Sequence, residues 1–437
     1  MLTRRRVLGY SALLTEPRWL QVAAAQSPLR LAIIGTAYHY GSELQILADR
    51  FLVGYQHEGD WHLPNVRVVS MYVEKGPLAR GLRGERPAAA PGPEPASAGP
   101  SDLSATRAKE FGFRLCRNIP EALRAGGDQL AVDAVLAVVE QGDYPRNRKG
   151  QILYPRYEFF QQCVEVFEVE GRAVPYFNHQ SLSFSFRQAK NMVAASEKLR
   201  FPLMAGSSLP LSWRLPDIDI PAGAEIQDAV MVCPFRGMEF DALEAMQCML
   251  ERRTGGETGI KAVQLVEGDD VWAAGDAGRW SKEVLSSALS RSDATLGLTT
   301  VDGRPQDMAN SGVLPEVVRD PAAWFVEYND GIRATMLVLQ GADNDFTFSA
   351  RVAGHGLIAT QFFRSPVPNV AYSTNLTSRI EQMFMTRTAP FPVQRTLLTS
   401  GLYEAGMTSK AQLNQRVATP QLAVRYQAPA GSQYARS

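Results

Sequence analysis

Leu29-Arg30-Leu31-Ala32-Ile33-Ile34-Gly35 is a short, mostly apolar run that ends in glycine. The apolar residues follow one another without the polar alternation of a half-buried strand, so the run predicts a strand that is buried on both faces. From Gly41 to Val53, apolar side chains recur at helical spacing and predict a helix. The next apolar run, Val66 to Val73, predicts a second strand.

The same alternation of strand and helix continues to about residue 207. Helices are predicted over 104–111, 120–125, 157–169 and 186–199, and strands over 114–116, 132–139, 173–177 and 202–206. Strands that alternate with helices predict a doubly wound parallel sheet covered by helices on both faces. We therefore predict a first α/β domain over residues 28–207.

The second half of the chain has a different pattern. Strands are predicted over 261–266, 331–339, 345–352 and 359–363, with fewer helices between them. This pattern favours a C-terminal α+β domain, residues 208–437, with an open, mainly antiparallel sheet. A last helix, 394–405, is expected to lie across that sheet.

Composition excludes several classes of protein. The 437 residues include 45 basic and 45 acidic side chains, so no cationic surplus is available for a nucleic-acid partner. The 4 cysteines are far apart and form no Cys-x-x-Cys pair, which argues against a zinc ribbon or a disulfide-built fold. Because the sequence has no apolar run of membrane-spanning length, no membrane span is predicted.

Two segments are set apart from the fold. Arginines at Arg4 to Arg6 precede the apolar run Val7 to Leu14, and Ala23-Ala24-Ala25 follows as a cleavage site, an order that resembles a twin-arginine export signal. Residues 1–27 thus predict a periplasmic or secreted protein, the alternative being a disordered start on a cytoplasmic one. Residues 76–102 are rich in proline, glycine and alanine and predict a flexible insertion.

The turn after the first strand is a candidate phosphate site. A strand that runs through a glycine turn into a helix presents unpaired backbone amides and the positive end of the helix dipole. At the end of the second strand, Glu74 offers a carboxylate to a ribose, or is an ordinary exposed glutamate. His39 either contacts a ligand or caps the helix. The residues predicted to bind a cofactor, NAD or NADP, are Gly35, Thr36, Ala37, Tyr38, His39 and Glu74.

Several segments, in this order, resemble the Gfo/Idh/MocA oxidoreductases, over roughly residues 29–410. They are Leu31-Ala32-Ile33-Ile34-Gly35, Arg107-Ala108-Lys109-Glu110-Phe111-Gly112-Phe113, Val132-Asp133-Ala134-Val135-Leu136, Gly171-Arg172-Ala173-Val174, Asp330-Gly331-Ile332-Arg333-Ala334 and Ala389-Pro390-Phe391-Pro392. The resemblance implies a Rossmann-like first domain, a nicotinamide cofactor and a sugar, polyol or glycoside as substrate. It also implies an oligomer that assembles through the C-terminal sheet.

The sequence departs from this family at the residues that do the chemistry. Where the family has a Glu-Lys-Pro signature, whose lysine touches cofactor and substrate, this chain has Phe177-Asn178-His179. Where a later helix carries His-x-x-Asp, this chain has Glu244 and Gln247 at that spacing. Neither member of the usual proton relay is present.

We identify substitutes for these residues. His179 titrates near neutral pH and is a candidate acid or base, with Asn178 orienting a hydroxyl; the alternative is a histidine that is only hydrogen-bonded. Glu244, a further catalytic candidate, and Gln247 share a helix face and are candidates to hold substrate hydroxyls, or form an ordinary hydrated face.

A long polar loop, 140–156, leaves the carboxyl end of a predicted strand, where open sheets bind ligands. Tyr144 and Arg156 in this loop are candidate substrate contacts. Arg214 is a further candidate at the rim of the site, its alternative being a structural ion pair. The spacing of His57 and His62 fits no standard metal site, and no metal is predicted.

Three functions are compatible with the sequence. The first is an NAD(P)-dependent oxidoreductase, or a glycosidase that uses NAD, with a tightly retained cofactor. The second is a non-catalytic sugar- or nucleotide-binding protein on the same scaffold. The third is a structural subunit of an oligomer.

Overall fold

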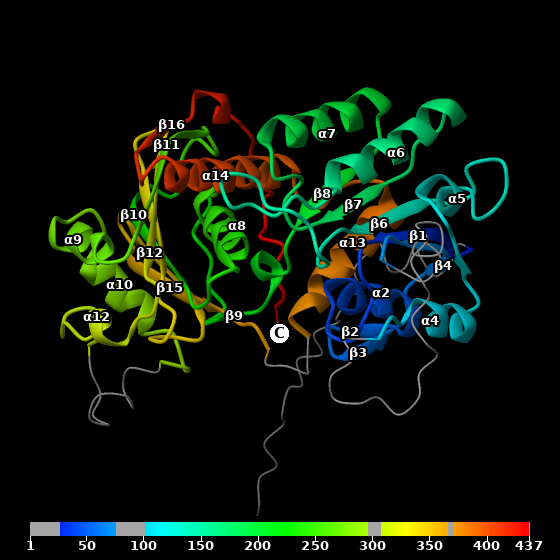
Figure 1. Cartoon of the computed structure of the whole chain (residues 1–437). Coiled ribbons are helices and arrows are strands. Elements are labelled where there is room, and N and C mark those ends of the chain that lie inside the picture. The colour runs from blue at the N-terminus through cyan, green and yellow to red at the C-terminus, as the bar shows by residue number, and fades with distance from the viewer. Residues whose placement is uncertain (1–26, 76–100, 296–306, 366–370, 437) are drawn as a thin grey trace, which may run out of the picture.

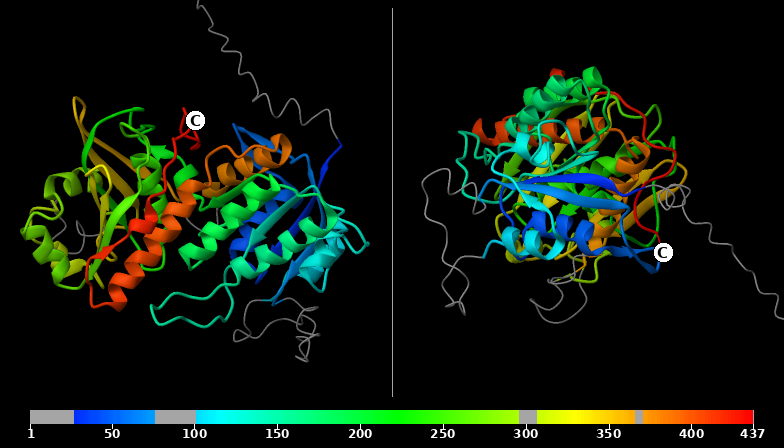
Figure 2. Two further views of the ribbon diagram at one scale, coloured as in Figure 1. Left: turned by 90° about the horizontal axis from the view of Figure 1, so that it is seen from above. Right: turned by 90° about the vertical axis from the view of Figure 1, so that its right-hand side faces the viewer.

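The computed structural model describes residues 27–75, 101–295, 307–365 and 371–436. Most of the predicted export signal and most of the predicted proline-rich insertion lie outside these residues. Two sheets lie side by side, one in each half of the molecule, and the long helix α14 (Gln394–Ala411) runs between them (Figure 1; Figure 2).

The first sheet has 6 strands in the order β5-β4-β1-β6-β7-β8, all parallel. These strands are β1 (Leu29–Gly35), β4 (Val66–Val73), β5 (Arg114–Leu115), β6 (Ala134–Val138), β7 (Tyr176–His179) and β8 (Leu203–Gly206). β1 and β6, at the centre, are apolar because helices cover both faces of the sheet. This is the predicted doubly wound arrangement.

Helices cover both faces of this sheet. α5 (Ile119–Leu123), α6 (Arg156–Glu170) and α7 (Phe186–Leu199) pack on one face, and α2 (Glu43–Val53) and α4 (Ser104–Phe111) on the other. α13 (Thr374–Thr386), from late in the chain, returns to the face that α2 covers. A small hairpin, β2 (Tyr55–His57) and β3 (Asp60–His62), follows α2.

The strand β7 begins later than predicted. The sequence predicts a strand over 173–177, whereas the structure has Tyr176–His179. Pro175 has no N–H group to donate to the neighbouring strand, and its carbonyl accepts from Val135 N at 2.9 Å. The shift places His179 at the carboxyl end of the strand, where ligands bind in such sheets.

The second sheet has 8 strands in the order β16-β11-β12-β13-β10-β14-β15-β9. The strands are β9 (Arg214–Leu215), β10 (Ile226–Cys233), β11 (Ile260–Glu267), β12 (Ala322–Tyr328), β13 (Arg333–Val338), β14 (Phe346–Val352), β15 (Gly356–Phe362) and β16 (Val417–Ala418). It is mainly antiparallel, as predicted; β10 and β13 form a parallel pair. β10 and β12 were not predicted from the sequence.

Helices cover both faces of this sheet as well. α8 (Glu239–Leu250) and α14 pack on the side facing the first domain. α9 (Asp270–Asp276), α10 (Lys282–Leu289) and α12 (Leu314–Val317) close the outer side over a second apolar core. The oligomer that the sequence predicts through this sheet stays a prediction; in the described residues, α9, α10 and α12 cover the outer face of the sheet.

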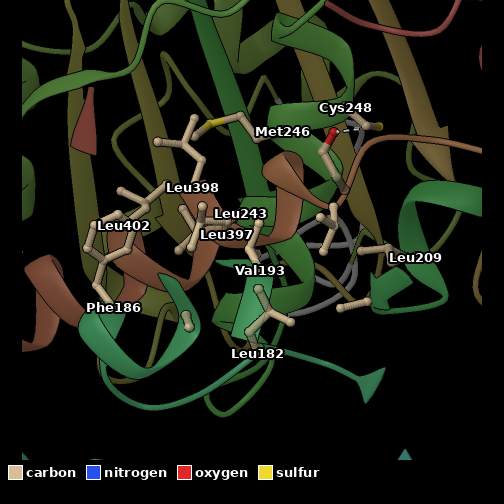
Figure 3. Packing of buried hydrophobic residues seen from close by; sticks show 14 of the residues in the cluster. Leu182, Phe186, Val193, Leu209, Leu243, Met246, Cys248, Leu397, Leu398 and Leu402 are labelled. Atoms are coloured by element: carbon tan, nitrogen blue, oxygen red, sulfur yellow. Dashed lines mark hydrogen bonds between the residues drawn. The ribbon is translucent and has the colours of Figure 1, made fainter. Parts of the chain in front are cut away.

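The junction between the halves is a packed core. Apolar side chains of α14 meet those of α7 and α8 there (Figure 3). They are Leu397, Leu398 and Leu402 of α14, Phe186 and Val193 of α7, and Leu243 and Met246 of α8. α14 is longer than the predicted 394–405 and spans Gln394–Ala411. It therefore fixes the position of α8 relative to the carboxyl ends of β7 and β8.

Candidate active site

A cavity of about 360 Å³ lies at the carboxyl ends of β6, β7 and β8, against the start of α8. Its polar lining includes Glu43 of α2, Glu140 after β6, His179 of β7 and Asp241 of α8. The cavity is of the size that small-molecule sites have, and it lies where parallel sheets bind ligands.

His179 is buried and faces two carboxylates. Its Nδ1 atom lies 3.5 Å from Glu140 Oε1, and its Nε2 atom lies 3.9 Å from Glu43 Oε2. Arg156 holds Glu140 in turn, with Nη2 donating to Oε1 at 2.8 Å. His179, Glu140 and Arg156 thus contact one another in sequence at the wall of the cavity.

The charges around His179 shift its titration. Burial lowers the pKa of His179, yet the nearby carboxylates, Glu140 first among them, raise it above its usual value. Burial raises the pKa of Glu140, but His179 and Arg156 outweigh burial and hold it below its usual value. Both shifts favour a protonated imidazole beside an ionised Glu140.

A second titrating group faces the same cavity. Asp241, in the first turn of α8, is buried, and burial above all raises its pKa to about 7. Gln180 Nε2 donates to both of its carboxylate oxygens, at 3.1 and 3.3 Å. Gln180 adopts a φ of 63°, a conformation that costs a non-glycine residue free energy and that occurs at functional sites.

The remaining walls carry cations and aromatic rings. Arg146 and Arg364 line the cavity, and the Arg364 guanidinium lies 5.1 Å from the centre of the Tyr372 ring. Tyr403 and Phe240 pack edge to face at 6.3 Å. Such walls offer apolar faces to a sugar ring and hydrogen-bond donors to its hydroxyls.

The glycine turn leads into α2, whose first residue, Glu43, lines the cavity. Tyr38 is buried beneath the turn, where its hydroxyl donates to Asp49, and Tyr40 is 74% exposed. His39 Nδ1 lies 3.0 Å from Tyr40 O, and its main-chain N donates to Ser42 Oγ at 3.1 Å. Ser42 caps α2 by accepting from Gln45 N. His39 is thus part of the turn that precedes the helix cap.

The groups that could hold a dinucleotide are engaged by one loop. Glu43 N, in the first turn of α2, donates to Gln141 Oε1 at 3.3 Å, and the Tyr144 hydroxyl donates to Glu74. The donors and acceptors that a pyrophosphate and a ribose require are therefore present, an amide at a helix start and a carboxylate at a strand end. The residues fit a dinucleotide once the loop side chains leave them.

Three predicted site residues lie elsewhere. Asn178 is buried behind His179, and its Nδ2 donates to His179 O at 3.1 Å and Ser181 O at 2.9 Å. Tyr144 contacts Glu74 rather than the cavity, while Arg156 does line it. Arg214 forms an ion pair with Asp219 at 2.8 Å, the structural alternative for this residue.

Glu244 and Gln247 also lie outside the cavity. Glu244 accepts from Ser207 N at 2.6 Å and from Thr396 Oγ1 at 2.7 Å, so it joins β8, α8 and α14. Gln247 is buried among Glu257, Tyr328 and Tyr426. They share a helix face as predicted, but that face packs inside the protein. The prediction of substrate contacts for Gln247 and of catalysis for Glu244 is wrong, because α14 and the C-terminal segment cover this side of α8.

Sequence reasoning missed Glu43, Glu140 and Asp241. Glu140 follows β6 and Glu43 opens α2, so both lie at the carboxyl edge of the sheet where ligands bind, and that position was the available signal. Asp241 is in the first turn of α8, one turn before Glu244. Among the described residues, no group of three or more His, Cys, Asp or Glu side chains is placed to hold a metal ion.

Solved structures share the whole architecture. GenD2 from gentamicin A biosynthesis, crystallised in complex with NAD, has a TM-score of 0.54 at 12% identity, covering 90% of this chain and 97% of its own. Myo-inositol dehydrogenase from Lactobacillus casei, in complex with NAD(H) and myo-inositol, has a TM-score of 0.51 at 11% identity and 93% and 100% coverage. A probable dehydrogenase from Thermotoga maritima has a TM-score of 0.50 at 11% identity and 90% and 100% coverage.

The chain has the fold of these dehydrogenases. No protein-family model matches the sequence, and no curated protein does. At such low identity, the similarity to these dehydrogenases is one of fold. In this chain the carboxyl edge of the first sheet lies against the second domain, and this is where His179 and its carboxylates lie. In the part of the chain that the structure describes, no helix is long and apolar enough to cross a bilayer.

Proposed function

We propose that this protein is an NAD(P)-dependent oxidoreductase that acts on a sugar, polyol or glycoside. One observation carries the proposal: His179, buried between Glu140 and Glu43, faces a cavity between the two domains of a dehydrogenase fold. A buried imidazole paired with a carboxylate is an arrangement suited to moving a proton to and from a hydroxyl. Two solved proteins of this fold hold NAD, and one of them also holds myo-inositol.

The cofactor would lie along the carboxyl edge of β1 and β4. The first turn of α2 would supply amides to its pyrophosphate, and Glu74 would accept hydrogen bonds from a ribose. When bound, the nicotinamide supplies the hydride acceptor or donor of the reaction. An exported enzyme has no cytoplasmic pool of nucleotide, so a tightly retained cofactor and export by the twin-arginine route belong to the same proposal.

The proton would move through His179. Its Nδ1 side faces Glu140, which stays ionised and holds the ring, so Nε2 is the atom that exchanges a proton with the substrate hydroxyl. The distances of 3.5 and 3.9 Å are looser than hydrogen bonds, as catalytic contacts often are before substrate binds. Asp241, with a pKa of about 7, offers a second exchangeable proton in the same cavity.

The substrate would be held by neutral and cationic side chains around the cavity. Gln151 and Arg146 line it from the long loop, and Arg364 lines it from the segment after β15. Tyr372 and Tyr403 offer ring faces. Amides, guanidinium groups and aromatic faces together suit a compact polyhydroxylated molecule.

A non-catalytic sugar- or nucleotide-binding protein is the second candidate. It is favoured by Gln141 and Tyr144, which already engage the helix amide and Glu74, and by the lack of the family's lysine and helix histidine. The cavity would then bind its ligand without turnover.

Analysis of the purified full chain tests the proposal. The protein is denatured and the released small molecules are measured by absorbance and mass; the emptied protein is then titrated with NAD and with NADP by calorimetry. We expect nicotinamide nucleotide in the extract or binding in the micromolar range. Inositols, hexoses and glycosides are then screened for nucleotide reduction. Binding of a sugar with no nucleotide in the extract and none bound would favour the second candidate.

A further inference from the structure

The loop that leaves β6 rests on the two places that a dinucleotide would take. Glu140 O accepts from the Thr36 hydroxyl, Gln141 Oε1 accepts from Glu43 N, and the Tyr144 hydroxyl donates to Glu74. We call residues 141–144 the covering segment. Its contacts reach the start of α2 and the end of β4, while Glu140, just before it, contacts the glycine turn.

Two of these contacts use groups that a dinucleotide would also contact. An amide in the first turn of a helix is a donor suited to a phosphate oxygen, and here a side-chain amide oxygen takes it. A carboxylate at the end of the second strand is an acceptor suited to ribose hydroxyls, and here the phenol hydroxyl of Tyr144 takes it. A bound dinucleotide and these two side chains would need the same atoms.

The covering segment is held from outside as well. Lys75 Nζ lies 5.0 Å from the centre of the Tyr144 ring, and the Tyr154 ring packs edge to face on Tyr144 at 5.5 Å. Within the segment, Gln141 has a φ of 62° and Gly142 a φ of 110°. A left-handed conformation at Gln141 costs free energy that the contacts of the segment must offset. Movement of the segment would release that cost.

We propose that the covering segment is a built-in competitor of the dinucleotide, so that nucleotide binds only after Gln141 and Tyr144 leave the α2 amide and Glu74. The inference rests on the proposed function, because it requires a dinucleotide at this edge of the sheet. Apparent affinity is then the intrinsic affinity reduced by the fraction of molecules in which the segment is open. Weakening the segment should strengthen binding, the reverse of what removal of a ligand contact does.

The variant Tyr144→Phe tests the proposal. It keeps the ring and its packing on Tyr154 but removes the hydroxyl that donates to Glu74, a charge-assisted bond. We expect NAD to bind the emptied Tyr144→Phe chain about tenfold more tightly than wild type in calorimetry. The double variant with Gln141→Ala should bind more tightly again. Tyr157→Phe is the matched control, because Tyr157 lies on α6, away from the covering segment, and its hydroxyl accepts from Asn191 Nδ2 at 3.3 Å.

Hydrogen exchange gives a second readout that needs no turnover. Bound NAD should speed exchange at the amides of residues 141–144 in wild type. If a chain that binds NAD shows unchanged hydrogen exchange at these amides, the proposal that the covering segment competes with the dinucleotide is overturned. NAD affinity of Tyr144→Phe equal to or weaker than that of wild type would also overturn it and would leave the proposed function standing.

The remaining outcomes separate the two proposals. If wild type fails to bind NAD and NADP while the double variant binds one of them, both the covering segment and the dinucleotide site are supported. If wild type and both variants fold, as judged by circular dichroism, and none binds either nucleotide, the proposed function is refuted. The proposal that the covering segment competes with a dinucleotide is then refuted as well.

Discussion

His179 and Glu140 face each other at the carboxyl ends of two adjacent parallel strands, with Nδ1 3.5 Å from Oε1. The pairing of β6 with β7, in which Ala137 lies opposite Asn178, places the residues that follow each strand side by side. Arg156, at the start of α6, holds Glu140 from the other side at 2.8 Å. The acid–base pair is therefore fixed by the sheet itself.

Replacement of His179 should remove turnover without unfolding the chain. In His179→Gln, the imidazole that exchanges a proton with the substrate is lost, and we expect kcat to fall about 10²- to 10⁴-fold. His355→Gln, in the exposed turn before β15, is the matched control and should keep wild-type kcat. Wild-type turnover in His179→Gln would remove the histidine from the reaction.

Glu140→Gln should move the pH profile to lower pH. Glu140 is the leading charge that raises the pKa of His179, so without it the pKa of the imidazole falls. Because alcohol oxidation requires the unprotonated imidazole, activity should persist about one pH unit or more further into the acid range. Kinetics from pH 5 to 9 measure the shift. Glu158→Gln, an exposed change on α6, should leave the profile in place, and an unmoved acid limb in Glu140→Gln would contradict the pairing.

Asp241→Asn should change the pH dependence of stability. Burial raises the pKa of Asp241 to about 7, whereas in the unfolded chain the pKa is about 3.9. Between these values the folded state holds a proton that the unfolded state has released, so the contribution of Asp241 to stability falls as pH rises through this range. Asparagine has no such proton. The difference in melting temperature, variant minus wild type, should therefore be larger at pH 8 than at pH 5. An equal difference at the two pH values would refute the raised pKa of Asp241.

Glu244→Ala should weaken the fold and spare the site. The change leaves Ser207 N and Thr396 Oγ1 without their acceptor and opens a cavity, which we expect to cost about 2–4 kcal/mol. Since Glu244 does not line the active-site cavity, the KM and kcat of the folded fraction should match wild type. Urea unfolding and steady-state kinetics measure the two effects. A lower kcat with an unchanged free energy of unfolding would show that Glu244 acts in the reaction.

Gly406→Ala should destabilise the protein even though alanine favours helices. A Cβ at Gly406 would lie 2.0 Å from Trp324 Cζ3, where α14 packs on β12. The helix preference of alanine gains up to about 1 kcal/mol, and overpacking costs about 1–3 kcal/mol. We expect a lower free energy of unfolding in urea. Lys410→Ala, on the exposed side of α14, should have little effect, and a gain in stability for Gly406→Ala would contradict the packing.

The elements of the first domain could be predicted because each leaves a local signal. The strand 66–73 and the helices 104–111 and 186–199 occur at the predicted residues, since apolar periodicity and caps are properties of neighbouring positions. The strand β7 is displaced by the missing donor of Pro175. β10 and β12 escaped prediction; β10 pairs with β13 and β14, far along the chain, and β12 pairs with the distant β11 as well as with β13, which follows it directly.

The sequence by itself determined the layered architecture and the glycine turn after β1, while the end of β7 at His179 was fixed by the structure. Only the tertiary structure decided which carboxylates surround that histidine. Glu43, Glu140 and Asp241 belong to three separate elements and meet through the strand order of one sheet and the packing of α14 against α8. The same packing buries Glu244, one helical turn beyond Asp241. Periodicity tells which residues share a helix face, but whether that face meets a cavity or another helix depends on contacts between distant parts of the chain.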